Sequence, residues 1–277
     1  MILFAKPVAD AINAKTALRI KALAKKPHLR VVLVGHNAGS EVYVRNKGKR
    51  AAELGADFGL DRLPETVTQA DLLAHVKKLA GDPSVTAMLV QMPLPAHLDP
   101  VPVTAAVPPS KDVDGFCPEN FGRALAGDPA AVPPCTPAGI IAMLDHYGVQ
   151  LAGKDVTVVG KSNVVGKPTA VMLANRDATV TICHKGTKDL AAHTRGADVL
   201  VVAAGCAGLI RADMVKPGAT VVDVGINRLP DGKLAGDCDF DAVSKIADIS
   251  PVPGGVGPMT MAMLFSNLAT LAERAAR

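Results

Sequence analysis

The chain has 277 residues, 49% of them hydrophobic, yet it contains no Trp and only two Tyr and six Phe. This length allows two modest domains or one large one, and an interior built from Ala, Val, Leu and Gly is common in α/β proteins. The formal net charge is only +4, and no basic run is interleaved with aromatic residues, so the composition argues against a nucleic-acid-binding protein.

The cysteines point to free thiols in a reducing compartment. Their number is odd and their spacing is wide, which fits neither a disulfide framework nor a zinc site, and we expect no metal. They are Cys117, Cys135, Cys183, Cys206 and Cys238. The N-terminus carries no charged-then-apolar signal segment, and no stretch approaches the roughly 18 consecutive apolar residues of a membrane span. We therefore expect a soluble, cytoplasmic protein.

Short β-branched runs alternate with longer helical patterns along almost the whole chain. Each run is apolar on both faces, which is typical of buried strands in a parallel sheet. The predicted strands are Arg30–Val34, Val85–Val90, Val156–Val159, Thr179–Cys183, Val199–Val202 and Thr220–Val224. The predicted helices are Ala9–Lys25, Ser40–Leu54, Thr68–Ala80, Thr136–Tyr147, Val165–Asn175 and Pro258–Arg274. The residue types predict N-caps at Ser40 and Thr68, and C-terminal glycines at Gly55, Gly81 and Gly148.

Between Pro93 and Pro137 the regular pattern gives way to a Pro-rich region. Prolines at this density cannot continue helices or central strands, so the segment is predicted to be a linker. It also contains Asp112, Asp114 and Asn120, which would allow it to form the wall of a site. Asp112 is interpreted as a turn-capping residue and Asp114 as a ligand-binding one.

A second series of strands and helices begins after this region, and its first strand leads into a candidate phosphate-binding loop. Strand VTVVG runs into KSNVVGKP, where Gly160 and Gly166 bracket the turn and Ser162 takes the place of a middle glycine. Glycines let the backbone approach a phosphate, and a helix N-terminus offers free N–H groups to it. The loop favours a dinucleotide, although an ordinary strand–helix turn has a similar pattern.

The loop after the next strand indicates which dinucleotide would bind. NAD sites usually place an acid at this point for the ribose 2′-hydroxyl, whereas NADP sites offer cations. Here the chain reads CHKGTKD, with no acid before Asp189. Lys185 could bind a 2′-phosphate or be a solvated loop lysine, and Lys188 is interpreted as solvated. His184 is interpreted as a loop residue.

Tyr43 and Lys47 are four residues apart and so share one face of a predicted helix, a spacing that surface stripes also show. They belong to a motif, SxxYVxxK, that is followed in order by VQMPLP, KDVDGF, PCTPAG, GKSNVVGKP and PVPGGVGPMT. Together these strings resemble the methylenetetrahydrofolate dehydrogenase/cyclohydrolase family, and the resemblance covers residues 1 to about 270. It implies a bifunctional enzyme of one-carbon metabolism, a homodimer, tetrahydrofolate derivatives as substrates and NADP as cofactor.

The resemblance also implies roles for individual residues. Lys47 matches the catalytic lysine, Tyr43 the aromatic against the folate, Gln91 the glutamine that hydrogen-bonds the lysine, and Asp114 the acid that holds the pterin. Besides these four, the substrate-binding positions are Gly254, Gly255 and Pro258. The cofactor-binding positions are Gly160, Lys161, Ser162, Val165, Gly166, Lys185 and Ile226. Two positions depart from the family: Arg is common where Lys161 stands, and Ser or Arg where Lys185 stands.

The chemistry of the two expected reactions agrees with these residue types. Oxidation of 5,10-methylenetetrahydrofolate requires the substrate carbon to be placed against the nicotinamide. Hydrolysis of the resulting methenyl cation to 10-formyltetrahydrofolate requires a group that moves protons near neutral pH, and desolvation of a lysine favours its neutral form.

The expected fold is two α/β domains flanking a cleft, the second of them Rossmann-like. Residues 1–136 with 258–277 are predicted to bind folate and residues 137–257 to bind NADP. Two alternatives remain open at this stage. One is another two-domain dehydrogenase, such as one for shikimate, and the other is a non-catalytic nucleotide-sensing or scaffold protein.

Overall fold

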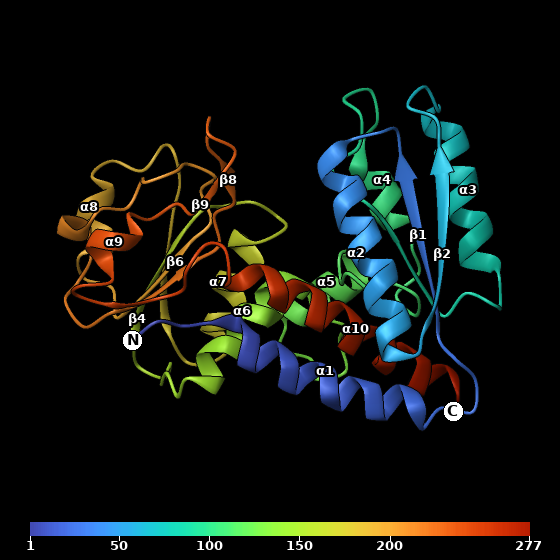
Figure 1. Cartoon of the computed structure of the whole chain (residues 1–277), viewed down its shortest axis with the longest axis horizontal. Helices are drawn as coiled ribbons and strands as arrows, with labels where there is room; N and C mark the ends of the chain where they lie inside the picture. Colours follow the sequence, from blue (N-terminus) through green and yellow to red (C-terminus); the bar gives the residue numbers. More distant parts are fainter. The chain divides into compact units, whose positions relative to one another are not determined.

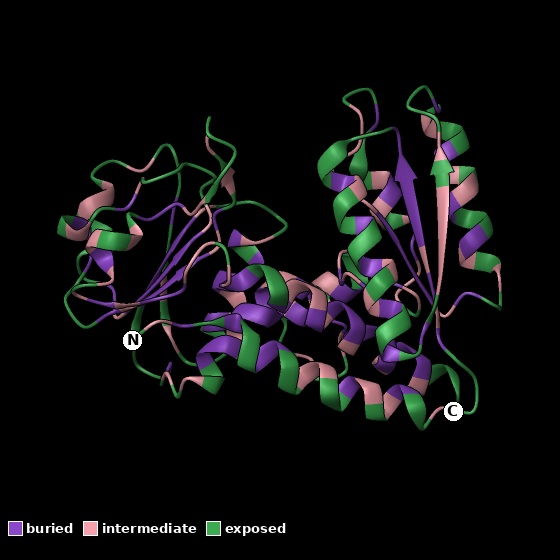
Figure 2. Ribbon diagram, viewed as in Figure 1, coloured by how far each residue is buried: buried purple, intermediate pink, exposed green.

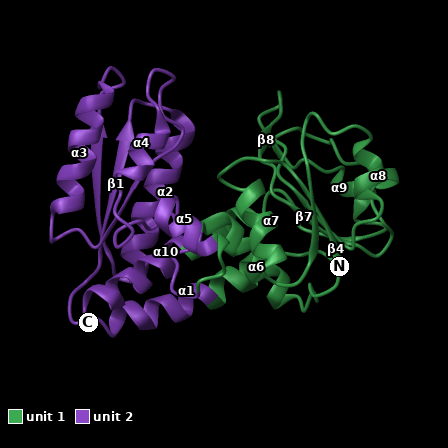
Figure 3. Ribbon diagram, turned by 180° about the vertical axis from the view of Figure 1, so that it is seen from behind, with its two compact units in different colours: residues 1–11, 125–128, 134–263 green, residues 12–124, 129–133, 264–277 purple.

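The protein is described by a computed structural model that covers residues 1–277. The chain forms two compact units (Figure 3). Unit 1 contains residues 1–11, 125–128 and 134–263, and unit 2 contains residues 12–124, 129–133 and 264–277. Each unit has its own parallel β-sheet, so the α/β class expected from the alternating pattern is confirmed.

Unit 2 is built on a three-stranded sheet with the order β2-β1-β3 (Figure 1). The central strand β1 (His28–Val34) pairs in parallel with β2 (Asp57–Leu63) and β3 (Ala87–Val90). The helices of this part of the chain are α1 (Ala5–Lys21), α2 (Ala38–Leu54), α3 (Gln69–Gly81), α4 (Pro100–Ala105) and α5 (Pro118–Leu125). Helix α2 packs against β1 and β2.

Strand β2 was not predicted from the sequence. Its segment, DFGLDRL, carries two Asp and one Arg, and its residues are mostly half-buried, whereas β1 is largely buried (Figure 2). The edge position explains the difference, because only one side of an edge strand is paired and its polar side chains reach solvent.

The prediction of a linker between Pro93 and Pro137 was wrong for two segments, which form α4 and α5. Helix α4 begins at Pro100 with Asp99 as its N-cap, whose carboxylate accepts a hydrogen bond from the Val101 amide. Its prolines lie in the first turn, where the N–H that proline lacks has no partner within the helix. These prolines therefore begin a helix instead of preventing one.

Unit 1 contains a five-stranded parallel sheet with the order β10-β7-β6-β4-β5. The strands are β4 (Asp155–Val159), β5 (Thr179–Cys183), β6 (Val199–Val202), β7 (Thr220–Asp223) and β10 (Asp248–Ile249). The remaining elements are α6 (Cys135–His146), α7 (Gly166–Ala174), α8 (Leu190–Thr194), the 3-10 turn η1 (Ala212–Met214), α9 (Phe240–Val243) and the antiparallel pair β8 (Asn227–Arg228) and β9 (Leu234–Ala235). From β4 the chain moves to β5 on one side and then returns to β6 on the other. This reversal is the topological switch point of a Rossmann-like sheet, outside which ligands bind.

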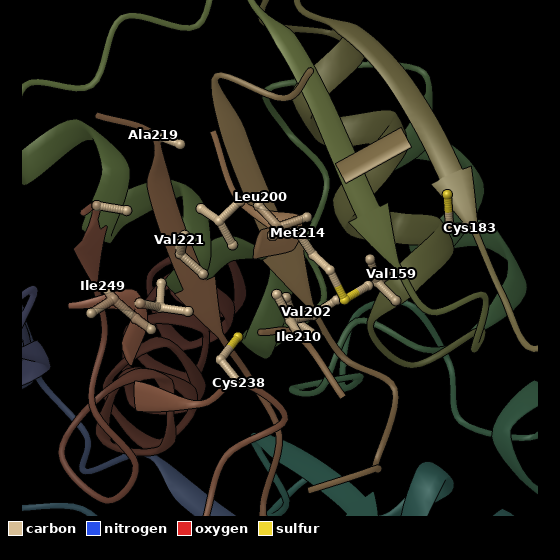
Figure 4. Packing of buried hydrophobic residues seen from close by; sticks show 13 residues of the cluster. Val159, Cys183, Leu200, Val202, Ile210, Met214, Ala219, Val221, Cys238 and Ile249 are labelled. Carbon is tan, nitrogen blue, oxygen red and sulfur yellow. The ribbon is translucent and has the colours of Figure 1, made fainter. Parts of the chain in front are cut away.

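One apolar cluster of unit 1 lies along its five-stranded sheet (Figure 4). It includes Leu200, Val221, Ile249 and the buried thiols of Cys183 and Cys238. The predicted burial of β5 on both faces was wrong, because this strand lies at the edge of the sheet and three of its five residues are exposed.

Two helix caps also differ from expectation. Asn37 and not Ser40 is the N-cap of α2, and its side chain accepts a hydrogen bond from the Ser40 amide. Gly81 is the last residue of α3 and Asp82 is its C-cap. Thr68 is confirmed as an N-cap, and Gly55 ends α2 in the left-handed conformation.

The last helix, α10 (Val256–Ala275), contributes residues 264–275 to unit 2. There the guanidinium of Arg19, on α1, binds the carboxylate of Glu273 and the hydroxyl of Thr270. None of the helices combines the length and the hydropathy that crossing a membrane requires.

Candidate active site

A buried lysine and a glutamine form the centre of the candidate site in unit 2. Lys47 lies on the face of α2 that packs against the sheet and is only 8% exposed. Its Nζ donates a 2.8 Å hydrogen bond to Oε1 of Gln91, the residue that directly follows β3. The amide nitrogen of Gln91 donates to the carbonyl oxygen of Met92 at 2.7 Å. This second bond orients the amide so that its oxygen faces the lysine.

Tyr43 lies one helical turn before Lys47 on α2, but its side chain is 48% exposed. A half-exposed ring next to a buried ammonium is available to a flat, partly apolar ligand. Ser40, at the start of the same motif, donates a long hydrogen bond of 3.5 Å to the carbonyl of Met92. Ser40 therefore contacts the same backbone group as Gln91, and its first position in SxxYVxxK was the signal for this contact.

The two aspartates of the KDVDGF turn have different environments. The carboxylate of Asp112 is buried and accepts hydrogen bonds from the amides of Gly115, Phe116 and Cys117 at 2.8–3.2 Å. It also accepts from the Asn120 side chain. Asp112 is thus a turn-capping residue, as predicted.

Asp114 is partly buried and lines a small pocket at the end of β3. The pocket walls are formed by Met88, Leu89, Val90, Met92, Thr104, Val107, Asp112, Asp114, Phe116 and Cys117. The pocket is mostly apolar, and the carboxylate of Asp114 is a hydrogen-bond acceptor on its wall.

Buried groups next to the pocket stabilise this turn. Asn267, on α10, donates from its side-chain amide to the carbonyls of Val113 and Pro133, both at 3.0 Å. Burial raises the pKa of the Cys117 thiol to about 12. Cys117 is therefore a neutral wall residue at physiological pH.

The predicted dinucleotide loop lies in unit 1, between β4 and α7. A Cβ atom on Gly166 would overlap the carbonyl oxygen of Gly160, so the turn has room only for glycine there. The hydroxyl of Ser162 accepts hydrogen bonds from the amides of Val165 and Gly166 at 3.1 and 3.4 Å. Ser162 thus holds the turn closed in the place of the middle glycine, and its side chain is exposed together with that of Lys161.

The other predicted cofactor and substrate residues of unit 1 follow the carboxyl ends of its strands. Lys185 follows β5 and is exposed, in a tight turn where the His184 amide donates to the Thr187 hydroxyl. Ile226 follows β7 and is 53% exposed. Gly254 and Gly255 follow β10, and Pro258 is the third residue of α10.

No functional or structural role was predicted from the sequence for one pair of buried acids in unit 1. Asp223 at the end of β7 and Asp237 after β9 are 2% and 0% exposed. Desolvation raises the pKa of the Asp223 carboxyl. The only signal in the sequence was an Asp in the string GDCDF, which ordinary turns also contain. Single-sequence reasoning could not separate this Asp from a surface residue.

Comparison with known proteins finds two domains of one family in the chain. Residues 3–114 match the catalytic domain of tetrahydrofolate dehydrogenase/cyclohydrolase, and residues 134–276 match the NAD(P)-binding domain of the same family. The bifunctional protein FolD of Burkholderia thailandensis is 52% identical over 273 residues, which are 97% of this chain and 95% of the relative.

Two solved structures are similar over nearly their full length. The bifunctional FolD methylenetetrahydrofolate dehydrogenase/cyclohydrolase from Campylobacter jejuni has a TM-score of 0.97 and 45% identity, covering 99% of both chains. The Trypanosoma brucei methylenetetrahydrofolate dehydrogenase-cyclohydrolase, solved with NADP and an inhibitor, has a TM-score of 0.94 and 36% identity, covering 100% of this chain and 98% of the other. The chain therefore belongs to the tetrahydrofolate dehydrogenase/cyclohydrolase family.

Proposed function

We propose that this bifunctional enzyme oxidises 5,10-methylenetetrahydrofolate to the 5,10-methenyl form with NADP, and hydrolyses that product to 10-formyltetrahydrofolate at the site that contains Lys47. The observation that carries the proposal is the buried Lys47, which donates to an oriented Gln91. Burial disfavours the charged form of an amine, so a lysine in this position can accept and return a proton near neutral pH.

In the hydrolytic step we assign proton transfer to Lys47 and its orientation to Gln91. Water adds to the methenyl carbon, and the neutral amine of Lys47 accepts a proton from that water. The bond between this carbon and N5 then breaks, N5 takes up a proton, and the hydroxyl proton is lost as the formyl group forms. The sum is one water consumed and one proton released, which matches the conversion of a cation into a neutral formamide.

Tyr43 and Asp114 are proposed to bind the folate. The half-exposed ring of Tyr43 offers a stacking surface, and Asp114 offers an acceptor in the pocket at the end of β3. Gly254, Gly255 and Pro258 are proposed as further substrate contacts on the basis of their match to the family motif.

The residues of the unit 1 loop fit a dinucleotide. The close approach of Gly166 to Gly160 leaves the backbone uncovered by side chains, and two exposed cations, Lys161 and Lys185, lie in the loops after β4 and β5. We propose that Gly160, Ser162, Val165 and Gly166 hold the phosphates with Lys161, and that Ile226 is a further contact. Lys185 would bind the 2′-phosphate. The nicotinamide, when bound, accepts the hydride from the methylene carbon.

We propose the domain assignment that the motifs indicate. Residues 1–136 with 258–277 would form the folate-binding domain and residues 137–257 the NADP-binding domain. The compact units support a two-part division, although unit 1, which contains residues 137–257, also includes residues 1–11, 125–128, 134–136 and 258–263.

We also propose a homodimer that works in a reducing cytoplasm. The dimer rests on the family resemblance, and the compartment is supported by five cysteines that form no disulfide. Light scattering coupled to gel filtration gives the mass of the particle, and a mass near 28.5 kDa would contradict the dimer.

A single spectrophotometric assay tests the function. Methylenetetrahydrofolate is mixed with enzyme and with either NADP or NAD, and both NADPH and methenyltetrahydrofolate formation are followed. We expect both to form with NADP and the methenyl product to disappear by hydrolysis. Hydride transfer from a hydroxy acid such as shikimate, without methylenetetrahydrofolate oxidation, would contradict the proposal. The absence of all turnover would favour a scaffold protein.

A further inference from the structure

Asp237 is a completely buried carboxylate whose hydrogen bonds go to an exposed loop. Its Oδ2 accepts from the amides of Ala204 and Gly205 at 2.6 and 2.9 Å. Its Oδ1 accepts from the amide of Cys206 and from Nδ2 of Asn227, both at 2.8 Å. All four donors are N–H groups, which an ionised carboxylate can accept together.

The loop that Asp237 holds lies beside the candidate dinucleotide turn. It directly follows β6, which pairs with β4, so the two loops emerge from neighbouring strands at the same edge of the sheet. A Cβ atom on Gly160 would overlap the carbonyl oxygen of Ala203, so the two backbones are in contact. The strand order reverses between β4 and β6, and this is where dinucleotides bind in such sheets.

A second buried acid fixes Asp237 itself. Asp223 accepts hydrogen bonds from the amides of Asp237 and Cys238 at 2.9 and 2.8 Å, and from that of Gly225. Cys238 belongs to the apolar cluster of unit 1, so the segment that contains Asp237 is anchored in the core (Figure 4). Asp237 also accepts a hydrogen bond from the side chain of Asn227 and so fixes the segment that contains Ile226.

A role in packing alone does not explain this arrangement. Burying an anion is costly, and an apolar residue would fill the same space without that cost. The bonds of Asp237 instead order the backbone of Ala204, Gly205 and Cys206, which are exposed and contribute little to the core.

We infer that Asp237 is a positioning residue that holds the loop of residues 203–206 as one wall of the NADP site. The inference rests on the proposed function, because it assigns the wall to the cofactor site described there. Asp237 belongs to unit 1, whereas Lys47 and Gln91, the residues proposed to serve the hydrolytic step, belong to unit 2.

Asp237→Asn tests this role with almost no change in volume. In either orientation its amide NH₂ would face two N–H donors, so at least two of the four hydrogen bonds are replaced by donor–donor contacts.

Titration calorimetry of Asp237→Asn should show NADP binding weakened by about tenfold or more. Hydrogen exchange of the cofactor-free protein should show faster exchange at the amides of residues 204–206. Hydrolysis of added methenyltetrahydrofolate, which needs no NADP, should stay within about twofold of the wild type. Asp241→Asn, an exposed acid four residues later, is the control for loss of charge and should match the wild type.

The outcomes separate the inference from the proposed function. A folded Asp237→Asn protein with wild-type NADP affinity and wild-type exchange at residues 204–206 would overturn the inference. If that variant does not fold, Asn227→Ala decides; it removes one of the four hydrogen bonds to Asp237, together with the bonds from Asn227 to the carbonyls of Ala235 and Gly236. Weaker NADP binding with intact hydrolysis supports the inference, and unchanged NADP binding overturns it. A wild-type protein that neither binds NADP nor hydrolyses the methenyl substrate would instead overturn the proposed function.

Discussion

Lys47 Nζ and Gln91 Oε1 are 2.8 Å apart, although the two residues are separated by 44 positions in the chain. The lysine comes from the buried face of α2 and the glutamine from the end of β3, and both elements belong to unit 2. Because the side-chain nitrogen of Gln91 donates to the Met92 carbonyl, the side-chain oxygen of Gln91 faces Lys47. This hydrogen bond holds the amine in place beside the end of β3.

Replacing this lysine should abolish hydrolysis selectively. Lys47→Gln keeps a polar side chain but removes the group that accepts the proton, so we expect the cyclohydrolase rate to fall roughly a hundredfold or more. The rate of methenyl hydrolysis measures the loss. Lys49→Gln, an exposed neighbour on the same helix, should keep the wild-type rate. NADP affinity should be unchanged in both, and normal hydrolysis by Lys47→Gln would remove this residue from the mechanism.

Cofactor choice should depend on Lys185. A 2′-phosphate carries nearly two negative charges, and no acid lies between Cys183 and Asp189 to repel it. We expect the wild type to prefer NADP and Lys185→Ala to weaken NADP affinity by about ten- to a hundredfold while NAD affinity barely changes. Lys188→Ala, in the same loop, is the control. Equal weakening of both cofactors would mean that Lys185 supports the loop instead of reading the phosphate.

A methyl group in the dinucleotide turn should block cofactor binding. In Gly166→Ala the new Cβ would overlap the Gly160 carbonyl oxygen, so the turn must open. We expect NADP affinity, measured by calorimetry, to fall by roughly a hundredfold. Gly196→Ala adds the same methyl group where no atom lies within 4 Å and should behave like the wild type. Unchanged affinity in Gly166→Ala would place the phosphates elsewhere.

In the native protein, only Cys206 should react quickly with a thiol reagent. It is exposed, whereas the other four cysteines are buried. Burial raises the pKa of Cys117 to about 12, so at pH 8 only about one molecule in ten thousand carries the thiolate there. The pKa values of Cys183 and Cys238 are also raised by burial. Titration with Ellman's reagent should release about one equivalent quickly, the remainder only in denaturant, and none quickly from Cys206→Ser. Rapid release of several equivalents from the native wild type would contradict this burial.

The turn that carries Asp114 should depend on Asn267. Asn267→Ala removes the two buried hydrogen bonds that its amide donates to the carbonyls of Val113 and Pro133, which costs about 2 kcal/mol. We expect the thermal midpoint to fall by roughly 5 °C and the KM for the folate substrate to rise. Calorimetry and steady-state kinetics measure the two effects, and Arg274→Ala, exposed on the same helix, should cause neither. A folate KM equal to that of the wild type would separate Asn267 from the site.

Some features were determined by the sequence by itself. The family strings and the strand–helix alternation are local patterns, and they were sufficient to predict the fold class, the family and the turn from Gly160 to Gly166. Asp112 could be read as a turn cap because its partners, Gly115 to Cys117, follow it within five residues. Short-range hydrogen bonds and steric limits of this kind depend on neighbouring residues only.

Other features were decided by the tertiary structure, because they depend on residues far apart in the chain. Strand β2 is stabilised by pairing with β1 and not by an apolar pattern of its own. The burial of Lys47 follows from the packing of α2 on the sheet, since its spacing from Tyr43 fits a surface stripe equally well. Asp237 meets the amides of residues 204–206 only because β6 ends beside its segment, 31 to 33 positions away. Long-range contacts have no signature in a single sequence, since the same residue types occur at solvated positions.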